Sequence, residues 1–92
     1  MGLTKMYNIE ELVEKAVLLM IRNTRGQCLT FTPKKVAKFA KLDTKPVTLS
    51  VVRWVIENRL TPHGIRIYKR SSHGVKYIVD STSPLWNKAK SL

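Results

Sequence analysis

The sequence is short of cysteine, of acidic residues and of long apolar runs, and these shortages exclude several classes of protein. Its single cysteine, Cys28, cannot form an internal disulfide, which is typical of a reducing compartment, and we expect it to be a small core residue. No apolar run reaches the roughly 18 residues of a membrane span, and the opening MGLTKMYNIEE carries acids where a secretory signal is apolar. We therefore expect an intracellular, cytoplasmic protein that does not enter a membrane.

Groups that carry out catalysis or bind metal ions are also scarce. His63 and His73 each precede a glycine in a predicted turn, with no cysteine or acid at metal-ligand spacing. The sequence has no glycine-rich phosphate loop, and no nucleophile can be paired with a general base. We therefore expect no enzymatic activity, no metal ion and no cofactor.

Positive charge is the strongest signal in what remains. The 92 residues, 43% of them hydrophobic, suffice for one domain with a single core. Lys and Arg number 17 against six acids, a net charge of +11. Residues 1–30 hold four bases and three acids, whereas residues 31–92 hold thirteen bases and three acids. Because phosphate backbones are the commonest intracellular polyanions, this favours a nucleic-acid partner over a cationic protein with no particular partner.

The first helix and a short strand are predicted from capping residues and apolar spacing. Asn8 followed by Glu11 is a capping-box start, and apolar residues at helical spacing continue from 9 to about 23. Residues 28–31 are too few for a helix and are stopped by Pro33, so they predict one brief strand.

A second helix is predicted for PKKVAKFAKL, with Thr32 as N-cap and Pro33 at the first helical position. Its lysines have no acid three or four residues away, so they form no salt-bridge lattice and face either solvent or an anion. The apolar face carries Val36, Phe39 and Ala40, and the opposite face carries Lys34, Lys38 and Lys41.

A third helix is predicted to run to about Leu60, because Asp43 and Thr44 favour the N-cap and Pro46 fits the first turn. Its polar residues are confined to a narrow arc, and a helix that is apolar over most of its circumference is usually buried or bound to a partner. One apolar stripe, suited to seat the helix on the core, consists of Leu49, Val52, Ile56 and Leu60.

A second apolar stripe on this helix has three interpretations. It contacts thymine methyl groups of DNA, packs against the first segment of the chain, or forms a protein interface. The surroundings VVRWVIE and SPLWNK also predict that Trp54 or Trp86 is covered by protein. The stripe consists of Val47, Val51 and Trp54, and the first segment would contribute Leu3, Met6 and Tyr7.

The segments IRIYKR and VKYIVD predict a β-hairpin with strands over 65–68 and 75–79, because β-type residues alternate with charged ones on both sides of a basic turn. A two-stranded ribbon alone is marginal in water, so we expect it to pack against the helices. The residues expected to make that contact are Ile65, Ile67, Tyr77 and Val79.

The charge of the hairpin is not balanced within it. Lys69, Arg70 and Lys76 have no acidic neighbour in the hairpin before Asp80, so we expect them to face an external anion. The chain beyond the hairpin, residues 81–92, is predicted to be a polar, loose tail interrupted by the apolar letters PLW.

The order helix, short strand, helix, turn, helix, hairpin resembles that of winged helix-turn-helix DNA-binding domains over about residues 8–80. The resemblance is carried by FTPKKVAKFAKLDTKPVTLSVVRWVIENRL and by the ribbon IRIYKRSSHGVKYIV, and the chain is similar to small basic winged-helix proteins of archaea and their viruses. It implies an α+β fold of three helices with a C-terminal β-hairpin wing, in a domain spanning residues 1–80 that a tail at 81–92 follows.

The resemblance also implies a binding mode. The third helix would enter the major groove of double-stranded DNA, presenting Thr48, Ser50, Val51 and Arg53, and the wing would touch the backbone or the minor groove. The lysines around the second helix would lie over phosphates. The nucleic-acid-binding residues predicted in this way are Lys34, Lys35, Lys38, Lys45, Thr48, Ser50, Arg53, Lys69, Arg70, His73 and Lys76.

Two functions follow as expectations. The first is a DNA-binding transcriptional regulator or general duplex binder, whose affinity comes mostly from phosphate contacts. The alternative is a winged-helix protein-interaction subunit of a DNA replication or transcription assembly, for example a small polymerase accessory subunit. The apolar first helix also allows a homodimer or larger protein assembly. The expected protein-interface residues are Val47, Val51, Trp54, Leu85 and Trp86.

Overall fold

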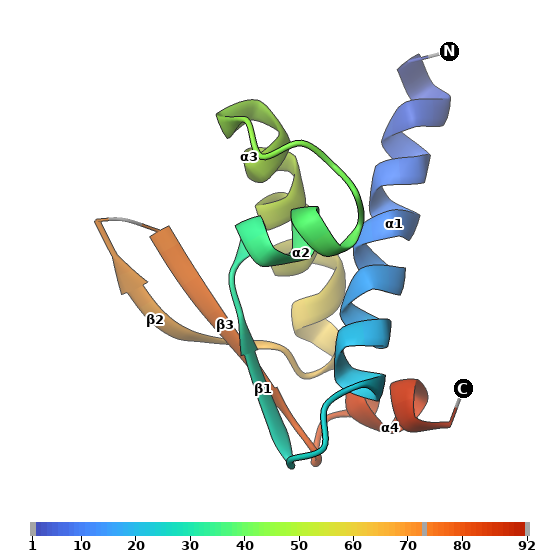
Figure 1. Cartoon of the computed structure of the whole chain (residues 1–92), viewed down its shortest axis with the longest axis vertical. Coiled ribbons are helices and arrows are strands. Elements are labelled where there is room, and N and C mark those ends of the chain that lie inside the picture. Colours follow the sequence, from blue (N-terminus) through green and yellow to red (C-terminus); the bar gives the residue numbers. More distant parts are fainter. Residues whose placement is uncertain (1, 73, 92) are drawn as a thin grey trace.

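The computed structural model describes residues 2–72 and 74–91, with side chains from Ile9 onward. Its described part is an α+β fold in which helices pack beside a three-stranded antiparallel sheet, and two of the strands extend away from the helices as a hairpin (Figure 1). The elements are α1 (Gly2–Arg22), β1 (Cys28–Phe31), α2 (Pro33–Phe39), α3 (Pro46–Val55), η1 (Ile56–Leu60), η2 (Thr61–His63), β2 (Arg66–Ser71), β3 (Gly74–Asp80) and α4 (Pro84–Lys90).

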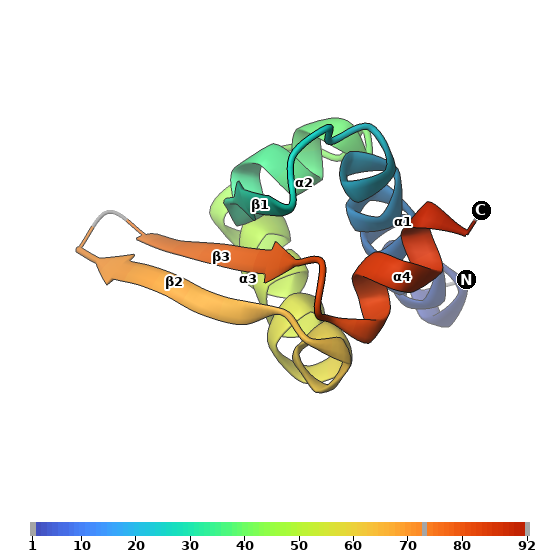
Figure 2. The same ribbon diagram turned by 90° about the horizontal axis from the view of Figure 1, so that it is seen from below.

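The sheet has the strand order β1-β3-β2, so β3 is its central strand. Burial alternates along β3: Val75, Tyr77 and Val79 are buried, whereas Lys76 between them is exposed. Every residue of β2 is exposed, because this edge strand extends beyond the helices. The hairpin of β2 and β3 is therefore attached to the body of the protein mainly through β3 (Figure 2).

The core lies where α1, α2, α3 and α4 meet the inner face of the sheet. Val13, Val17 and Ile21 recur at intervals of four residues on α1 and are fully buried, which places one face of this helix against the others. Phe31 and Tyr77 are cross-strand partners on the buried face, with ring centroids 5.7 Å apart.

Several predicted elements are confirmed. The strand over Cys28–Phe31 has the predicted bounds. The Thr32 hydroxyl accepts a hydrogen bond from the Lys35 amide at 3.2 Å, which confirms Thr32 as the N-cap of α2. The third helix reaches Leu60 as predicted, although its last five residues form the wider π-helical turn η1. Its predicted core stripe is buried at all positions except the half-buried Leu49.

The starts of two helices differ from prediction. Helix α1 begins at Gly2 rather than near Asn8, since nothing in the preceding residues breaks a helix and a capping residue starts one only where the chain before it is not helical. The N-cap of α3 is Lys45, without a side-chain cap bond. Asp43 instead accepts a hydrogen bond from the Lys45 amide at 3.0 Å and so closes the turn before the helix.

The prediction of a loose tail over residues 81–92 was wrong. Ser83 caps the helix α4, its hydroxyl accepting from the Trp86 amide at 3.1 Å, and α4 packs against α1. Leu85 and Trp86 are consequently buried in the core. The Lys90 ammonium donates to the carbonyl of Thr24 at 2.6 Å, which anchors the end of α4 to the turn after α1. Residues 84–90 thus belong to the domain, and the expectation that one tryptophan is covered is confirmed by Trp86.

Three apolar residues lie at the surface, contrary to prediction. Cys28 is exposed because it begins β1 at the outer end of the sheet, opposite Asp80. Phe39, the last residue of α2, was predicted to face the core but is 42% exposed. Ala37 is buried on this helix instead. Ile67 is 44% exposed because β2 has no helix across from it.

We predict that Ser83→Ala lowers the free energy of unfolding by about 1 kcal/mol, because it removes the N-cap of α4. For a domain of this size that corresponds to a fall in Tm of about 4–8 °C. Thermal unfolding followed by circular dichroism measures the change. The matched control is Ser81→Ala, at an exposed serine two residues earlier, for which a loss of the same size would contradict the capping role.

Candidate nucleic-acid interface

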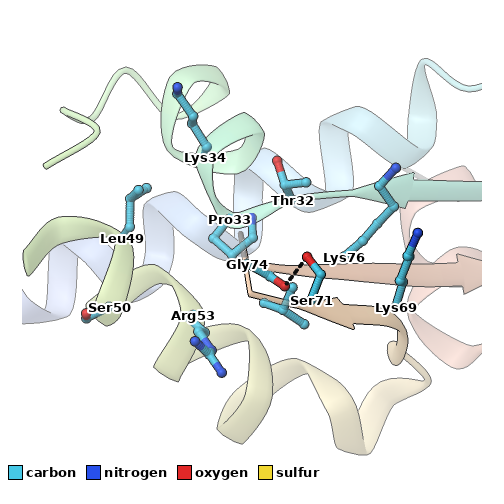
Figure 3. A pocket seen from close by; sticks show the side chains of 11 residues that line it. Thr32, Pro33, Lys34, Leu49, Ser50, Arg53, Lys69, Ser71, Gly74 and Lys76 are labelled. Atoms are coloured by element: carbon cyan, nitrogen blue, oxygen red, sulfur yellow. Dashed lines mark hydrogen bonds between the residues drawn. The ribbon is translucent and has the colours of Figure 1, made fainter. Parts of the chain in front are cut away.

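A groove of about 530 Å³ lies between the start of α2, one side of α3 and the hairpin (Figure 3). It forms because the hairpin extends past the helices, so that β2 and β3 form one wall while α2 and α3 form the other. We refer to it below as the groove. The lining residues are Thr32, Pro33, Lys34, Leu49, Ser50, Arg53, Lys69, Ser71, Gly74, Val75 and Lys76.

The charged residues that line the groove are all cationic. Lys34 comes from α2, Arg53 from α3, and Lys69 and Lys76 from the hairpin, and all four are exposed. Among the described residues, no carboxylate forms an ion pair with any of the three lysines. The groove is therefore suited to hold an anion or a polyanion.

The hairpin brings two of these lysines together. Lys69 of β2 and Lys76 of β3 are direct cross-strand partners, and Figure 3 shows them projecting on the same side. Like charges directly opposite each other in an antiparallel pair destabilise it. An anion in the groove would relieve this repulsion, whereas within the protein no described acid does so.

The single acid of the hairpin is engaged at its base, far from these lysines. The Arg66 guanidinium lies 2.6 Å from the Asp80 carboxylate across the two strands. The Thr82 hydroxyl and amide, and then Arg66, hold the pKa of Asp80 below its usual range. Charge is thus balanced at the root of the hairpin and unbalanced toward its tip.

A chain of hydrogen bonds links α3 to the sheet beside the groove. The Tyr77 hydroxyl donates to Glu57 Oε2 at 2.6 Å, and Arg53 Nε donates to the same oxygen at 3.0 Å. The Tyr77 hydroxyl and the Arg53 guanidinium lower the pKa of Glu57, while burial and the Glu57 carboxylate raise that of Tyr77 far above its usual range. Glu57 therefore stays ionised at neutral pH and holds Arg53.

The acids of α1 lie on the other side of the molecule. Glu10 pairs with Arg59 at 3.2 Å and Glu14 pairs with Lys88 at 3.1 Å. With Glu11 they line a second hollow of about 290 Å³ beside the end of the third helix. Since α1 and the hairpin lie on opposite sides of the protein (Figure 2), the three acids of α1 lie away from the lysines of the hairpin.

The groove gathers five of the predicted nucleic-acid-binding residues: Lys34, Ser50, Arg53, Lys69 and Lys76. A sixth predicted residue, His73, lies outside the described residues. The remaining predicted residues do not line the groove: Lys35, Lys38, Lys45 and Arg70 are exposed, and Thr48 is half-buried.

Thr48 is used within the protein. Its hydroxyl, followed by the Lys45 amide, holds the pKa of Asp43 below its usual range. Sequence reasoning also missed Glu57 and Tyr77 as residues that position Arg53. The spacing of Arg53 and Glu57, four residues apart on a helix, could have indicated their ion pair.

The second apolar stripe of α3 is largely uncovered. Val47 is 77% exposed and Trp54 is 53% exposed, whereas Val51 packs partly against the core. The side chains of Leu3, Met6 and Tyr7, which the first segment was predicted to pack against this stripe, lie outside the described part. Leu85 and Trp86, also predicted as interface residues, are unavailable to a partner because α4 buries them in the core.

No helix in residues 2–72 and 74–91 combines the length and apolar character needed to cross a membrane. The same residues contain no group of three or more His, Cys, Asp or Glu side chains arranged to hold a metal ion. Comparison with known families finds no matching protein-family model, and comparison with curated proteins and with solved structures finds no significant match either.

Proposed function

We propose that this protein binds double-stranded DNA in the groove and that its fold is a winged helix-turn-helix. The cross-strand pair of Lys69 and Lys76 carries the proposal, because its repulsion has no relief within the described protein and both residues line the groove. The element order and the strand order β1-β3-β2 are compatible with this fold, in which β2 and β3 form the wing.

The proposed binding mode has two kinds of contact, one with the phosphates and one with the bases. Lys34 on one wall of the groove and Lys69 and Lys76 on the other neutralise phosphates of the DNA backbone, and the released counterions supply most of the affinity. The exposed side of α3, from Val47 to Trp54, then faces the bases of the major groove. The acids of α1 lie on the opposite side of the protein, which orients the approach to DNA.

A titration of the purified protein onto labelled duplex of random sequence at two salt concentrations tests the proposal. We expect retention of duplex, with log affinity falling linearly against log salt by roughly 0.9 for each phosphate contact. If the three groove lysines each contact one phosphate, the slope has a magnitude of about 2.7 or more. A protein that retains no duplex at low salt would contradict the proposal.

A second candidate function is a winged-helix interaction subunit of a DNA replication or transcription assembly. The exposure of Val47 and Trp54 on one face of α3 favours it, since aromatic and aliphatic anchors dominate protein interfaces. Binding to DNA only in the presence of a polymerase or another factor would identify this function. Binding by the protein alone identifies the first.

We predict that duplex DNA protects Trp54, and not Trp86, from a neutral fluorescence quencher. Trp54 is 53% exposed on α3 and Trp86 is 5% exposed in the core. Acrylamide should therefore quench the free protein partially, and duplex should reduce that quenching, because α3 becomes covered. In the Trp54→Phe control the remaining fluorescence should be protected with or without duplex. Quenching of the parent that duplex leaves unchanged would show that this side of α3 stays in water.

A further inference from the structure

We propose that Arg53 makes the interface selective for guanine, and that Glu57 and Tyr77 position it for this purpose. The inference rests on the proposed function, because it assigns a base preference to the same groove. Arg53 is the only arginine among the described residues that line the groove, the other cations being lysines.

The hydrogen-bond chain determines what Arg53 can still bind. A guanidinium carries five N–H donors in a rigid planar fork. Arg53 directs its Nε donor to the Glu57 carboxylate at 3.0 Å, and the side chain remains 45% exposed. The outer N–H groups therefore remain available to two adjacent acceptors, such as O6 and N7 of guanine in the major groove.

Charge favours a base over a phosphate as the partner of this arginine. Arg53 is paired with the ionised Glu57, so it adds less to the attraction of the DNA backbone than the groove lysines and Arg70, whose charge also acts on Glu57. The Glu57 carboxylate would moreover repel a phosphate brought next to Arg53. A guanine edge is neutral and depends on the direction of the donors, which the pair provides, while the groove lysines remain for the phosphates.

The chain of hydrogen bonds ends on a core residue of the central strand. Tyr77 is completely buried, lies in the central strand of the sheet and packs against Phe31. Its hydroxyl donates to Glu57 at 2.6 Å, which fixes the carboxylate that in turn fixes Arg53. An arginine whose orientation is set before binding loses less conformational entropy when it meets its base.

Selection of bound duplexes from a random-sequence library, followed by sequencing, tests the inference. The parent should enrich guanine at one fixed position of the duplex. Substituting any other base for this guanine should weaken binding by about 5- to 150-fold. Arg53→Lys keeps the positive charge and removes the planar fork, so it should abolish that enrichment. Tyr77→Phe, which keeps the ring and removes the hydroxyl, should reduce the enrichment without altering the salt dependence.

Two arms separate a base contact from a phosphate contact. Replacing the selected guanine by 7-deazaguanine removes N7 and should weaken binding by the parent but not by Arg53→Lys. The control Lys69→Ala should weaken all duplexes alike and keep the guanine enrichment, since Lys69 contacts phosphate. Thermal unfolding of each variant confirms that it is folded, and Glu57→Gln, which keeps the shape of Glu57 but not its charge, provides a second reduction of the enrichment if Tyr77→Phe unfolds.

The outcomes are distinguishable from failure of the proposed function. If the parent binds duplex and enriches no guanine, or if Arg53→Lys keeps the enrichment, Arg53 does not select guanine, and the inference is wrong while the proposed function stands. If the parent binds no duplex at low salt, the proposed function is wrong and the guanine preference falls with it.

Discussion

Replacing Lys69 and Lys76 together by alanine is expected to weaken binding to every duplex, on the order of 100-fold at 50 mM salt and on the order of 10-fold at 200 mM. Both side chains line the groove from opposite strands of the hairpin. If each contacts one phosphate, the slope of log affinity against log salt should become shallower by about 1.8. Equilibrium titrations of unrelated duplexes over this salt range measure both quantities.

The same double variant should be at least as stable as the parent. Removing a pair of like charges that face each other across two strands relieves a repulsion of roughly 0.2–1 kcal/mol. The matched control is the double variant Lys15→Ala with Arg25→Ala, which removes two exposed bases from α1 and the turn after it. This control should keep nearly all of the affinity. Equal losses in both double variants would show that total charge, and not the groove, determines binding.

Gly64→Ala is expected to lower the free energy of unfolding by roughly 3–4 kcal/mol. Gly64 has φ of 107°, which residues with a Cβ rarely adopt, and an added Cβ would lie 2.2 Å from Ser83 Cβ. Ser83 is buried and caps α4, so it cannot move away without uncapping that helix. A loss of this size corresponds to a fall in Tm of about 12–30 °C.

Gly74→Ala is the control that separates backbone strain from the clash of an added Cβ with a neighbouring residue. Gly74 also has a positive φ, of 141°, but a Cβ added there meets no atom within 4 Å. We expect a loss of about 1–2 kcal/mol from backbone strain alone. Thermal unfolding of the two variants measures the difference. Equal losses would show that the clash of the added Cβ with Ser83 contributes nothing to the loss at Gly64.

Local signals in the sequence predicted the elements that depend on local interactions. Thr32 followed by Pro33 started α2, and alternation in VKYIV predicted the buried face of β3. The pair Ser83 and Pro84 is the same start signal, yet the helix after it was missed, because so short and polar a segment becomes helical only when Leu85 and Trp86 are buried against α1.

The candidate site depends on strand register and on tertiary contacts, which local patterns in the sequence do not determine. The lysines of the hairpin were predicted to face an anion, but their pairing depends on a register shift between Ile67 and Lys69 that local patterns do not determine. The hydrogen bond from Tyr77 to Glu57 joins residues 20 positions apart. Tyr77 was predicted as a core residue, which it is, and only the tertiary structure places its hydroxyl beside the groove.

Amide NMR of nitrogen-15-labelled protein titrated with a short duplex shows whether duplex DNA occupies the groove. We expect the largest shift changes at residues that line the groove, such as Lys34, Ser50, Arg53 and Lys76, and little change at Glu11 on the opposite side. Shift changes centred on α1 and α4, or none at saturating duplex in low salt, would contradict this expectation.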